Sequence, residues 1–448
     1  MKHNSSQFGC INSDAAGIDI GGRFHFVAVP AGRDAHAVRQ FNNFTTDLEQ
    51  LADWLSACRI KTVAMESTGV YWIPLYEMLE NRGFEVLLVN ARHVKNVPGR
   101  KSDVLDCQWI QQLHSYGLLR ASFRPEQAIC ELRAYTRQRE SLTRYASCHI
   151  QHMHKALAQM NVQLAAVVDD IAGITGMKII RAILSGERCP EQLAGYRDGR
   201  CKKSTEIIAK SLYGNFKEEH LFTLQQAVDL FDIYCKKIAD CDEVIEKILS
   251  RLASLQACAI TQHNEGIPKK RKRRKNELHF DATAYLERLT GVDLTKIDGL
   301  NHHSALRIMA EIGTDMSKWP SAKHFGSWLG LAPGTKISGG KVLSTKTKPS
   351  ANRAAALLRI AASTLHRSHC ALGAFLRRQK SRLGAPKAIT ATAYKIARLI
   401  YMMIKHGKNY VDSGQDYYER QYKDRIIRGM QKKASQWGLQ LVPAGATG

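Results

Sequence analysis

Four acidic residues near the start of the chain have the types and spacing of a metal-binding set. Asp19 lies between apolar residues in the segment GIDI, where an unpaired buried charge would cost several kcal/mol. Glu66 ends the apolar run KTVAME, and Asp103 and Asp106 are spaced to share one face of a helix. Mg²⁺ prefers oxygen ligands, and two such ions can clamp a scissile phosphodiester. We therefore expect these four carboxylates to converge on divalent cations.

Each of these residues also has an ordinary structural explanation when it is taken singly. A carboxylate at Asp103 is favoured at the start of a helix by the helix dipole, and Glu66 could be a solvated strand end. The metal-binding interpretation rests on the joint order of the four residues, in a chain whose net charge is strongly positive.

A second group that could do chemistry is the loop KISGGK. Ser338 offers a hydroxyl that needs activation to act as a nucleophile. Gly339 and Gly340 would let the backbone approach a phosphate closely, and Lys336 and Lys341 could neutralise it. From these residues alone, Ser-Gly-Gly is equally compatible with a plain loop. The hydroxyls of Ser344 and Thr345 nearby are competing candidates.

The elements that must position the four carboxylates alternate between strand and helix patterns over residues 15–120, which predicts an α/β domain. GIDIGGRFHFVAVP reads as two strands around a Gly-Gly turn, and KTVAMES and FEVLLVN read as further strands. Helices are expected over GVYWIPLYEMLENRG, ending at Gly83, and over SDVLDCQWIQQLHSYG, with Ser102 as its N-cap.

The rest of the chain is predicted to be mainly helical. Residues 125–260 carry two long helical patterns, expected to pair as antiparallel or coiled-coil helices around a small helical insertion at about 161–215. The segment LTKIDGLNHHSALRIMAEIG suggests a helix–hairpin–helix ending at Gly313. The boundaries we expect are 13–122, 123–265, a basic linker at 266–284, 285–412, and a weakly ordered tail at 413–448.

The charge balance indicates a polyanionic partner. Lys and Arg number 65 against 41 Asp and Glu, which gives a formal net charge of +24. This excess points to nucleic acid or an acidic membrane surface. The most basic segment could be a solvated linker or a nucleic-acid contact, and a second basic group lies just before Asp103. These candidate nucleic-acid-binding residues are Lys269, Lys270, Arg271, Lys272, Arg273, Arg274 and Lys275, together with Lys95, Arg100 and Lys101.

Other features narrow the cellular context. The 11 cysteines form no Cys-x-x-Cys pair, which favours reduced thiols over a disulfide framework or a zinc site. The sequence contains no run of about 18 uncharged apolar residues, so no membrane span is expected. The N-terminus lacks the apolar core of a signal peptide. His149, His152 and His154 have no acidic neighbour in the sequence and are read as solvated or groove-facing. We expect a cytoplasmic protein with no membrane partner.

The chain resembles the DEDD transposases of bacterial insertion sequences in several patterns. These are the order Asp…Glu…Asp-x-x-Asp, the segments AMESTGVYW and RKSDVLD, and the segment FGSWLGLAPGTKISGGK followed by an Ala/Leu-rich helix. The resemblance covers roughly residues 13–120 and 290–410. It implies a RuvC-like ribonuclease-H fold for the first region, with Asp19, Glu66, Asp103 and Asp106 holding Mg²⁺ or Mn²⁺. It implies a C-terminal transposase domain in which Ser338 is the nucleophile.

The resemblance also implies partners. Members of this family are RNA-guided recombinases, in which a non-coding bridge RNA pairs with donor and target DNA. The implied assembly is a homodimer or homotetramer whose active sites could be shared between protomers. Two other functions stay open from the residues: a Holliday-junction-type endonuclease that uses a metal-activated water, and a non-enzymatic RNA- or DNA-binding scaffold with structural carboxylates. The Ser-Gly-Gly loop favours the recombinase, and the ordered acidic set favours either enzyme over the scaffold.

Overall fold

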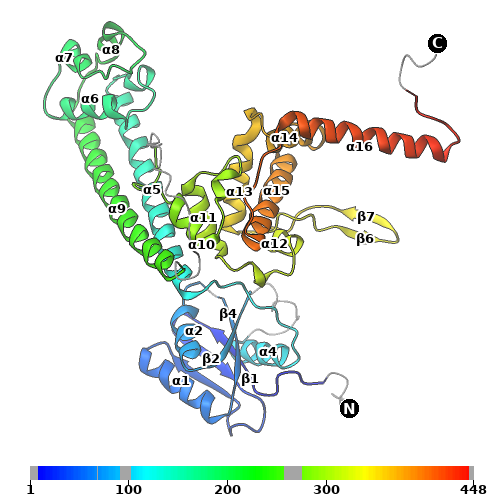
Figure 1. Ribbon diagram of the computed structural model, residues 1–448. Helices are drawn as coiled ribbons and strands as arrows, with labels where there is room; N and C mark the ends of the chain where they lie inside the picture. The colour runs from blue at the N-terminus through cyan, green and yellow to red at the C-terminus, as the bar shows by residue number, and fades with distance from the viewer. Residues whose placement is uncertain (1–8, 68, 91–101, 257–274, 443–448) are drawn as a thin grey trace. The chain divides into compact units, whose positions relative to one another are not determined.

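The computed structural model describes residues 9–67, 69–90, 102–256 and 275–442. The chain divides into two compact units, Met1–Arg124 and Pro125–Gly448. Figure 1 shows the chain coloured by residue number from the N-terminus to the C-terminus. The division falls between Arg124 and Pro125. The predicted helical spacer and C-terminal domain belong to one unit.

The first unit is built on a five-stranded mixed sheet in the order β3-β2-β1-β4-β5. The β1–β2 and β2–β3 pairs are antiparallel, and the β1–β4 and β4–β5 pairs are parallel. The predicted strands and Gly-Gly turn are confirmed. The strands are β1 (Ala15–Ile20), β2 (Phe24–Ala28), β3 (Val38–Asn42), β4 (Thr62–Glu66) and β5 (Glu85–Val89).

Helices cover both faces of this sheet. Side chains of Ile18 and Met65 join one core with α1 (Thr45–Ala57) and α2 (Trp72–Asn81). Because successive strand residues point to opposite faces, Gly17 lies on the other face, where α4 (Asp103–Ser115) packs against it. The helices α2 and α4 were predicted. The strand β3 and the helix α1 were not.

The second unit begins with two long helices that pack side by side, α5 (Gln127–Gln159) and α9 (Glu218–Gln256), as predicted. The short helices between them form a small apolar core of their own with the ends of both long helices. They are η1 (Leu164–Ala166), α6 (Ile174–Leu184), α7 (Pro190–Gly195) and α8 (Thr205–Ser211). The expected helical insertion is therefore present.

A buried ion pair joins the two long helices. The guanidinium of Arg139 lies 2.5 Å from the carboxylate of Asp242, and both side chains are almost fully buried. Arg139 also donates hydrogen bonds to the backbone oxygens of Asn276 and Glu277, so the partners of its guanidinium lie within the fold. Since breaking one partner of a buried pair leaves an uncompensated charge, this contact fixes where the chain returns after α9.

The remaining elements are helical apart from one hairpin. They are α10 (Thr283–Thr290), η3 (Leu294–Lys296), α11 (His302–Ile312), η4 (Met316–Lys318), α12 (Ala322–Trp328), β6 (Lys336–Ser338), β7 (Lys341–Ser344), α13 (Arg353–Thr364), η5 (Leu365–Arg367), α14 (Ala371–Leu383), α15 (Ala385–His406) and α16 (Gly414–Gln436). The hairpin extends away from these helices (Figure 1).

Two expectations about this region can be compared with the structure. α11 ends at Gly313 as predicted, and its N-terminus is closed by a capping box between Asn301 and Ser304. The weakly ordered tail expected at 413–448 is wrong for residues 414–436, which form α16. The guanidinium of Arg378 on α14 stacks on Tyr422 of α16, 3.2 Å from the ring centroid, and such stacking contributes to attaching this polar helix. None of the described helices is both long enough and apolar enough to cross a bilayer.

Candidate active site

Asp19 and Glu66 stand at neighbouring positions on two parallel strands. The register pairs Gly17 with Ala64 and Ile18 with Met65, and Asp19 and Glu66 are the next residue on each strand. Asp19 lies two residues after Gly17 and therefore points to the same face of the sheet as Gly17, which is the face covered by α4. The sheet thus sets both carboxylates on the α4 side.

The helix α4 brings the other two carboxylates to that place. The Nε2 of Gln111 donates to the backbone oxygen of Ala15 at 3.3 Å. One helical turn earlier, the backbone oxygen of Cys107 would lie 2.5 Å from a Cβ at Gly17. Four helix residues rise about 6 Å and two strand residues about 6.6 Å. One more helical turn back along α4, and two residues further along β1, this matching rise places Asp103 beside Asp19.

The first turn of α4 is fixed by its cap. Ser102, the predicted N-cap, accepts a hydrogen bond from the backbone N–H of Leu105 at 3.3 Å. Asp103 and Asp106 both lie in this first turn, where the helix dipole stabilises negative charge. Their spacing sets both on one face of the helix, so that each can act on Asp19.

The other three carboxylates lie near enough to Asp19 for their charges to act on it. The pKa of Asp19 is raised from its ordinary value of 3.8 to about 6. Burial is the largest cause, and the charges of Asp103, Glu66 and Asp106 add to it. Among the described residues, no lysine or arginine forms an ion pair with Asp19, Asp103 or Asp106. Within the described part of the chain, Asp19, Asp103 and Asp106 therefore lie near one another without an ion-paired lysine or arginine.

This donor set fits a hard divalent cation, because it consists of carboxylate oxygens whose charge needs compensation. In the part of the chain that the structure describes, no three acidic, histidine or cysteine side chains are gathered closely enough to enclose an ion as they stand. The backbone positions are brought together, and the carboxylates would still have to turn inward. The residues that could hold the ion are Asp19, Glu66, Asp103 and Asp106.

The second unit places Ser338 at the tip of the β6–β7 hairpin. Ser338 pairs with Lys341 across a two-residue turn, and Gly339 and Gly340 have φ values of 53° and 76°. Such a turn requires left-handed backbone, which favours glycine. The hydroxyl of Ser338 is exposed and has no hydrogen bond to any described residue. The hairpin therefore presents this hydroxyl to solvent.

The surroundings of Ser338 are exposed and mixed in character. Lys336 and Lys341 flank it, and Ile337, Val342 and Leu343 are exposed by 64%, 58% and 68%. Of the competing hydroxyls, the Ser344 oxygen accepts a hydrogen bond from the backbone N–H of Lys346 at 3.3 Å. That hydroxyl is partly engaged in the hairpin, whereas Ser338 is free to meet a partner.

Most of the predicted basic contacts cannot be placed. Lys95, Arg100 and Lys101, and the run from Lys269 to Arg274, lie outside the described residues. Lys275, the last of that run, pairs with Asp170 at 2.6 Å.

Of the three histidines named from the sequence, His152 and His154 are exposed and His149 is partly buried. The ring of His149 stacks on Tyr234 with centroids 5.3 Å apart. In the second unit, His302 accepts a hydrogen bond at Nδ1 from the backbone N–H of Ala282, and burial lowers the pKa of His303 to about 3. None of the described histidines belongs to a metal-binding group.

Sequence reasoning missed the role of Gly17. A Cβ at this residue would collide with the backbone of Gln111 and Cys107, so the glycine lets α4 lie directly on β1. The available signal was a glycine inside an apolar strand, which often marks a close approach of another backbone. This contact sets the first turn of α4 over the strand ends.

Comparison with known proteins places both candidate groups in matched regions. A family model described as a transposase, of the DEDD type of IS110 elements, matches residues 16–162. A second, described as the transposase of the IS116/IS110/IS902 family, matches residues 293–375. The first match contains all four carboxylates, and the second contains Ser338. No curated protein matches the chain.

Proposed function

This chain belongs to the IS116/IS110/IS902 family of transposases, and from that premise we propose that it cuts and rejoins DNA strands through Ser338. The observation that carries the proposal is the gathering of three further carboxylates, Glu66, Asp103 and Asp106, around Asp19. Its pKa is raised to about 6 by burial and by its three acidic neighbours. Stable proteins rarely keep such a set without a cation.

In this proposal Asp19, Glu66, Asp103 and Asp106 hold one or two divalent ions, Mg²⁺ or Mn²⁺. Such ions, when bound, stabilise the charge that develops on a phosphodiester during displacement. The chain's own contribution is to fix four oxygen donors on two strand ends and one helical turn. The sheet order, with antiparallel β2 and β3 beside parallel β1, β4 and β5, supports a RuvC-like ribonuclease-H fold.

Ser338 supplies the attacking oxygen. Its Oγ forms a bond to the scissile phosphorus while the bond from phosphorus to one strand-end oxygen breaks, and that oxygen leaves as a hydroxyl. Attack by a hydroxyl of another strand then reverses the exchange and releases the serine. Each step makes one phosphoester bond and breaks one, so rejoining needs no external energy source. Lys336 and Lys341, which flank the serine, can neutralise the phosphate.

The partners follow the same proposal. DNA is the substrate, as donor and as target, and a non-coding bridge RNA guides the choice of site. The excess of 65 basic over 41 acidic residues supports polyanionic partners of this size. The α10–α11 pair acts as a helix–hairpin–helix on phosphates, and a homodimer or homotetramer in the cytoplasm brings the two groups to the same strands.

One further function has an observation in its favour. The carboxylate set belongs to the first unit alone and could activate water without any serine, as in a Holliday-junction-type endonuclease. A scaffold that only binds RNA or DNA is disfavoured, because a structural role gives no reason to gather several carboxylates of like charge.

The test separates serine attack from water attack. Ser338→Ala removes the proposed nucleophile, and Ser344→Ala is the matched control on the same hairpin. The substrate is a labelled DNA strand carrying the element's own end, incubated with the guide RNA and Mg²⁺ and resolved under denaturing conditions. We expect a covalent protein–DNA adduct from the parent protein and from Ser344→Ala. Ser338→Ala should give no adduct and no cleavage while binding DNA normally.

The contrary result is equally clear. If Ser338→Ala cuts the strand at the parental rate and the parent never yields an adduct, water is the nucleophile. The endonuclease would then replace the recombinase. Omission of the divalent ion should abolish cleavage in either case, so it tests the carboxylate set separately from the serine.

A further inference from the structure

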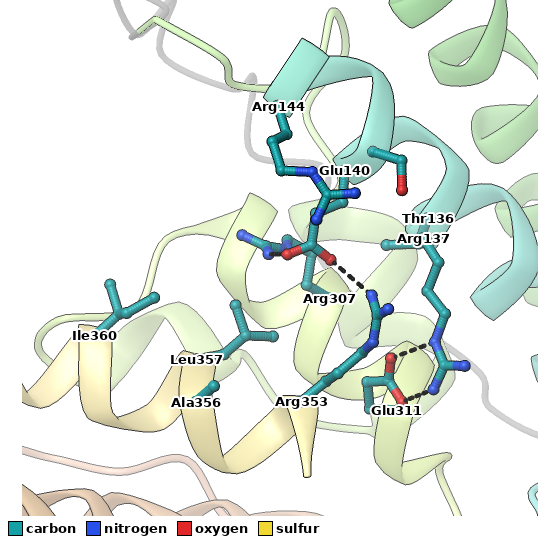
Figure 2. A pocket seen from close by; sticks show the side chains of 11 residues that line it. Thr136, Arg137, Glu140, Arg144, Arg307, Glu311, Arg353, Ala356, Leu357 and Ile360 are labelled. Carbon is teal, nitrogen blue, oxygen red and sulfur yellow. Dashed lines mark hydrogen bonds and ion pairs between the residues drawn. The ribbon is translucent and has the colours of Figure 1, made fainter. Parts of the chain in front are cut away.

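A cavity with an unusual concentration of arginines lies where three helices of the second unit meet. It has a volume of about 300 Å³ and opens between α5, α11 and α13 (Figure 2). Its charged lining consists of Arg137, Glu140, Arg144, Arg307, Glu311 and Arg353. We call this space the arginine cavity. None of these residues belongs to the candidate active site.

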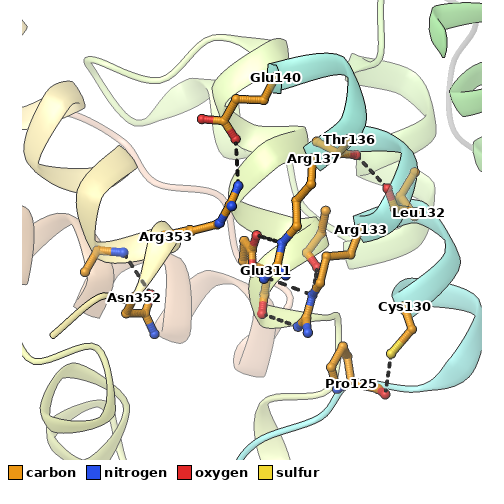
Figure 3. Close-up of polar contacts among 12 residues, drawn as sticks. Pro125, Cys130, Leu132, Arg133, Thr136, Arg137, Glu140, Glu311, Asn352 and Arg353 are labelled. Atoms are coloured by element: carbon orange, nitrogen blue, oxygen red, sulfur yellow. Dashed lines mark hydrogen bonds and ion pairs between the residues drawn. The ribbon is translucent and has the colours of Figure 1, made fainter. Parts of the chain in front are cut away.

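Some of the charge in the arginine cavity is already used within the protein. Glu311 accepts two hydrogen bonds from Arg137, at 2.8 and 2.7 Å. Its backbone oxygen and that of Ala310 accept from Arg133 beside it (Figure 3). Since Glu311 is mostly buried at this contact, its carboxylate is committed to the arginines of α5.

The second carboxylate is shared between two arginines. Glu140 on α5 accepts from Arg307 on α11, and it also lies 3.4 Å from Arg353 on α13. The 3.4 Å contact is long for a charge-assisted hydrogen bond, and Arg353 is half exposed. Most of the donor capacity of Arg353 therefore still faces the cavity or solvent.

Arg144 has no carboxylate partner among the described residues. Its side chain lines the cavity (Figure 2), and its guanidinium carbon lies 5.6 Å from the ring centroid of Tyr145. Four lining guanidiniums against two lining carboxylates leave two positive charges. The cavity is thus a site of excess positive charge built from three helices.

The remaining wall of the arginine cavity is apolar. It is formed by Ala356, Leu357 and Ile360 of α13, which share one face of that helix. Ile360 is 61% exposed. A free inorganic anion would gain nothing from this wall, whereas a nucleotide within a strand has a phosphate for the arginines and a sugar for the apolar side.

We propose that the arginine cavity binds a backbone phosphate of a DNA or RNA strand, with the adjoining sugar against Leu357 and Ile360. Arg144 and Arg353 make the phosphate contacts, and Arg137 and Arg307 are held in place by Glu311 and Glu140. The proposal rests on the nucleic-acid function proposed above. It adds a strand-holding site that contains neither Ser338 nor any of the four carboxylates.

The alternative is that these ion pairs only attach α5 to α11 and α13. Arg144→Gln separates the two, because Arg144 pairs with neither lining carboxylate. Arg359→Gln is the matched control, since Arg359 lies on α13 and does not line the cavity. Both changes are made in Ser338→Ala protein, so that binding is measured without cleavage.

Binding is followed by fluorescence anisotropy over a range of salt concentrations, with a DNA duplex and with a single-stranded RNA of equal length. One phosphate contact contributes a slope of about 0.9 for duplex DNA, or about 0.7 for a single strand, in the logarithm of affinity against the logarithm of salt. We expect Arg144→Gln to lower the slope by about that amount with the polymer that occupies the site. Affinity at low salt should fall roughly 3- to 10-fold, and Arg359→Gln should change neither value.

A second variant tests whether removing a negative charge from the cavity strengthens binding. Glu140→Gln frees Arg307 and Arg353 and should tighten binding and steepen the slope, compared with the exposed control Glu243→Gln on α9. A purely structural role predicts lower thermal stability and no gain in affinity.

The proposal fails if Arg144→Gln binds both polymers as Arg359→Gln does. It also fails if Arg144→Gln weakens only the binding of inorganic phosphate. Because the assay requires no cleavage, its result stands apart from whether Ser338 proves to be the nucleophile.

Discussion

Asp19 is a side chain whose ionisation works against folding of the metal-free protein. It is half-buried on β1, and its three acidic neighbours raise the free energy of its charged form. Asp14, at the start of the same strand, has the opposite surroundings. Hydrogen bonds from Lys61 and Arg33 lower the pKa of Asp14. The two residues therefore differ in what their ionisation contributes to stability.

This contrast predicts the effect of Asp19→Asn on the metal-free protein. A carboxyl whose folded pKa is raised to about 6 from 3.8 stabilises the fold below about pH 4, and that contribution is lost as pH rises through 6. Asp19→Asn should therefore raise the free energy of unfolding at pH 8 by up to about 3 kcal/mol, with the gain vanishing towards pH 4. Chemical denaturation at both pH values measures it.

Asp14→Asn is the control for the same measurement, and at pH 8 it should lower stability, because its ion pairs are lost. Added Mg²⁺ should raise the midpoint of thermal unfolding of the parent protein and of Asp14→Asn, but not of Asp19→Asn. A parental response to Mg²⁺ in Asp19→Asn would argue against a metal role for this carboxylate.

At the scale of elements, the contact between α4 and β1 determines whether the carboxylates meet. Gln111 of α4 contacts Ala15 of β1, and Cys107, one helical turn earlier, contacts Gly17. These two contacts set the register of the helix on the strand. A helix displaced outward at Gly17 would carry Asp103 and Asp106 away from Asp19. The arrangement of the candidate site thus depends on Gly17, a residue without a side chain of its own.

Gly17→Ala tests this dependence. The added Cβ meets backbone atoms that cannot rotate away, and overpacking of this kind costs about 1–3 kcal/mol. We expect that loss of stability in denaturant, together with loss of the stabilisation by Mg²⁺ and of DNA cleavage. Gly9→Ala, whose Cβ would meet nothing within 4 Å, should match the parent in all three. Retention of cleavage by Gly17→Ala would show that the position of α4 does not control the site.

Much of the first unit was predictable, because its strands are apolar runs bounded by turn residues and α4 has a clear N-cap. β3 was missed because VRQFN is a largely exposed edge strand with little apolar signal. The four carboxylates were found from their order, although their proximity depends on the packing of α4. The arginine cavity was not predictable, since Arg144, Arg307 and Arg353 are far apart in sequence and meet only where three helices pack.

For the whole molecule, the net charge of +24 makes binding to nucleic acid strongly dependent on salt, because phosphate contacts release counterions. The densest basic run, from Lys269 to Lys275, lies mostly outside the described residues. Its last member, Lys275, is paired with Asp170, so part of the charge of Lys275 is offset within the protein. The run is a candidate contact whose share of the binding can be measured directly.

Replacement of the six residues from Lys269 to Arg274 by glutamine should make the salt dependence of DNA or RNA binding shallower. Each lost contact lowers the slope by about 0.9 for duplex DNA, and filter binding at several salt concentrations measures it. Lys275→Gln alone should have a smaller effect than any other single replacement in the run. An unchanged slope in the six-residue variant would identify the run as a linker that touches no nucleic acid.

The β6–β7 hairpin has a consequence for the behaviour of the protein in solution. A two-stranded sheet has two open edges, and this one exposes Ile337, Val342 and Leu343. Such edges recruit further strands unless charge opposes it, and here Lys336 and Lys341 supply that charge. Salt screens these lysines, so the high ionic strength that strips nucleic acid from the protein also removes its protection against aggregation through the hairpin.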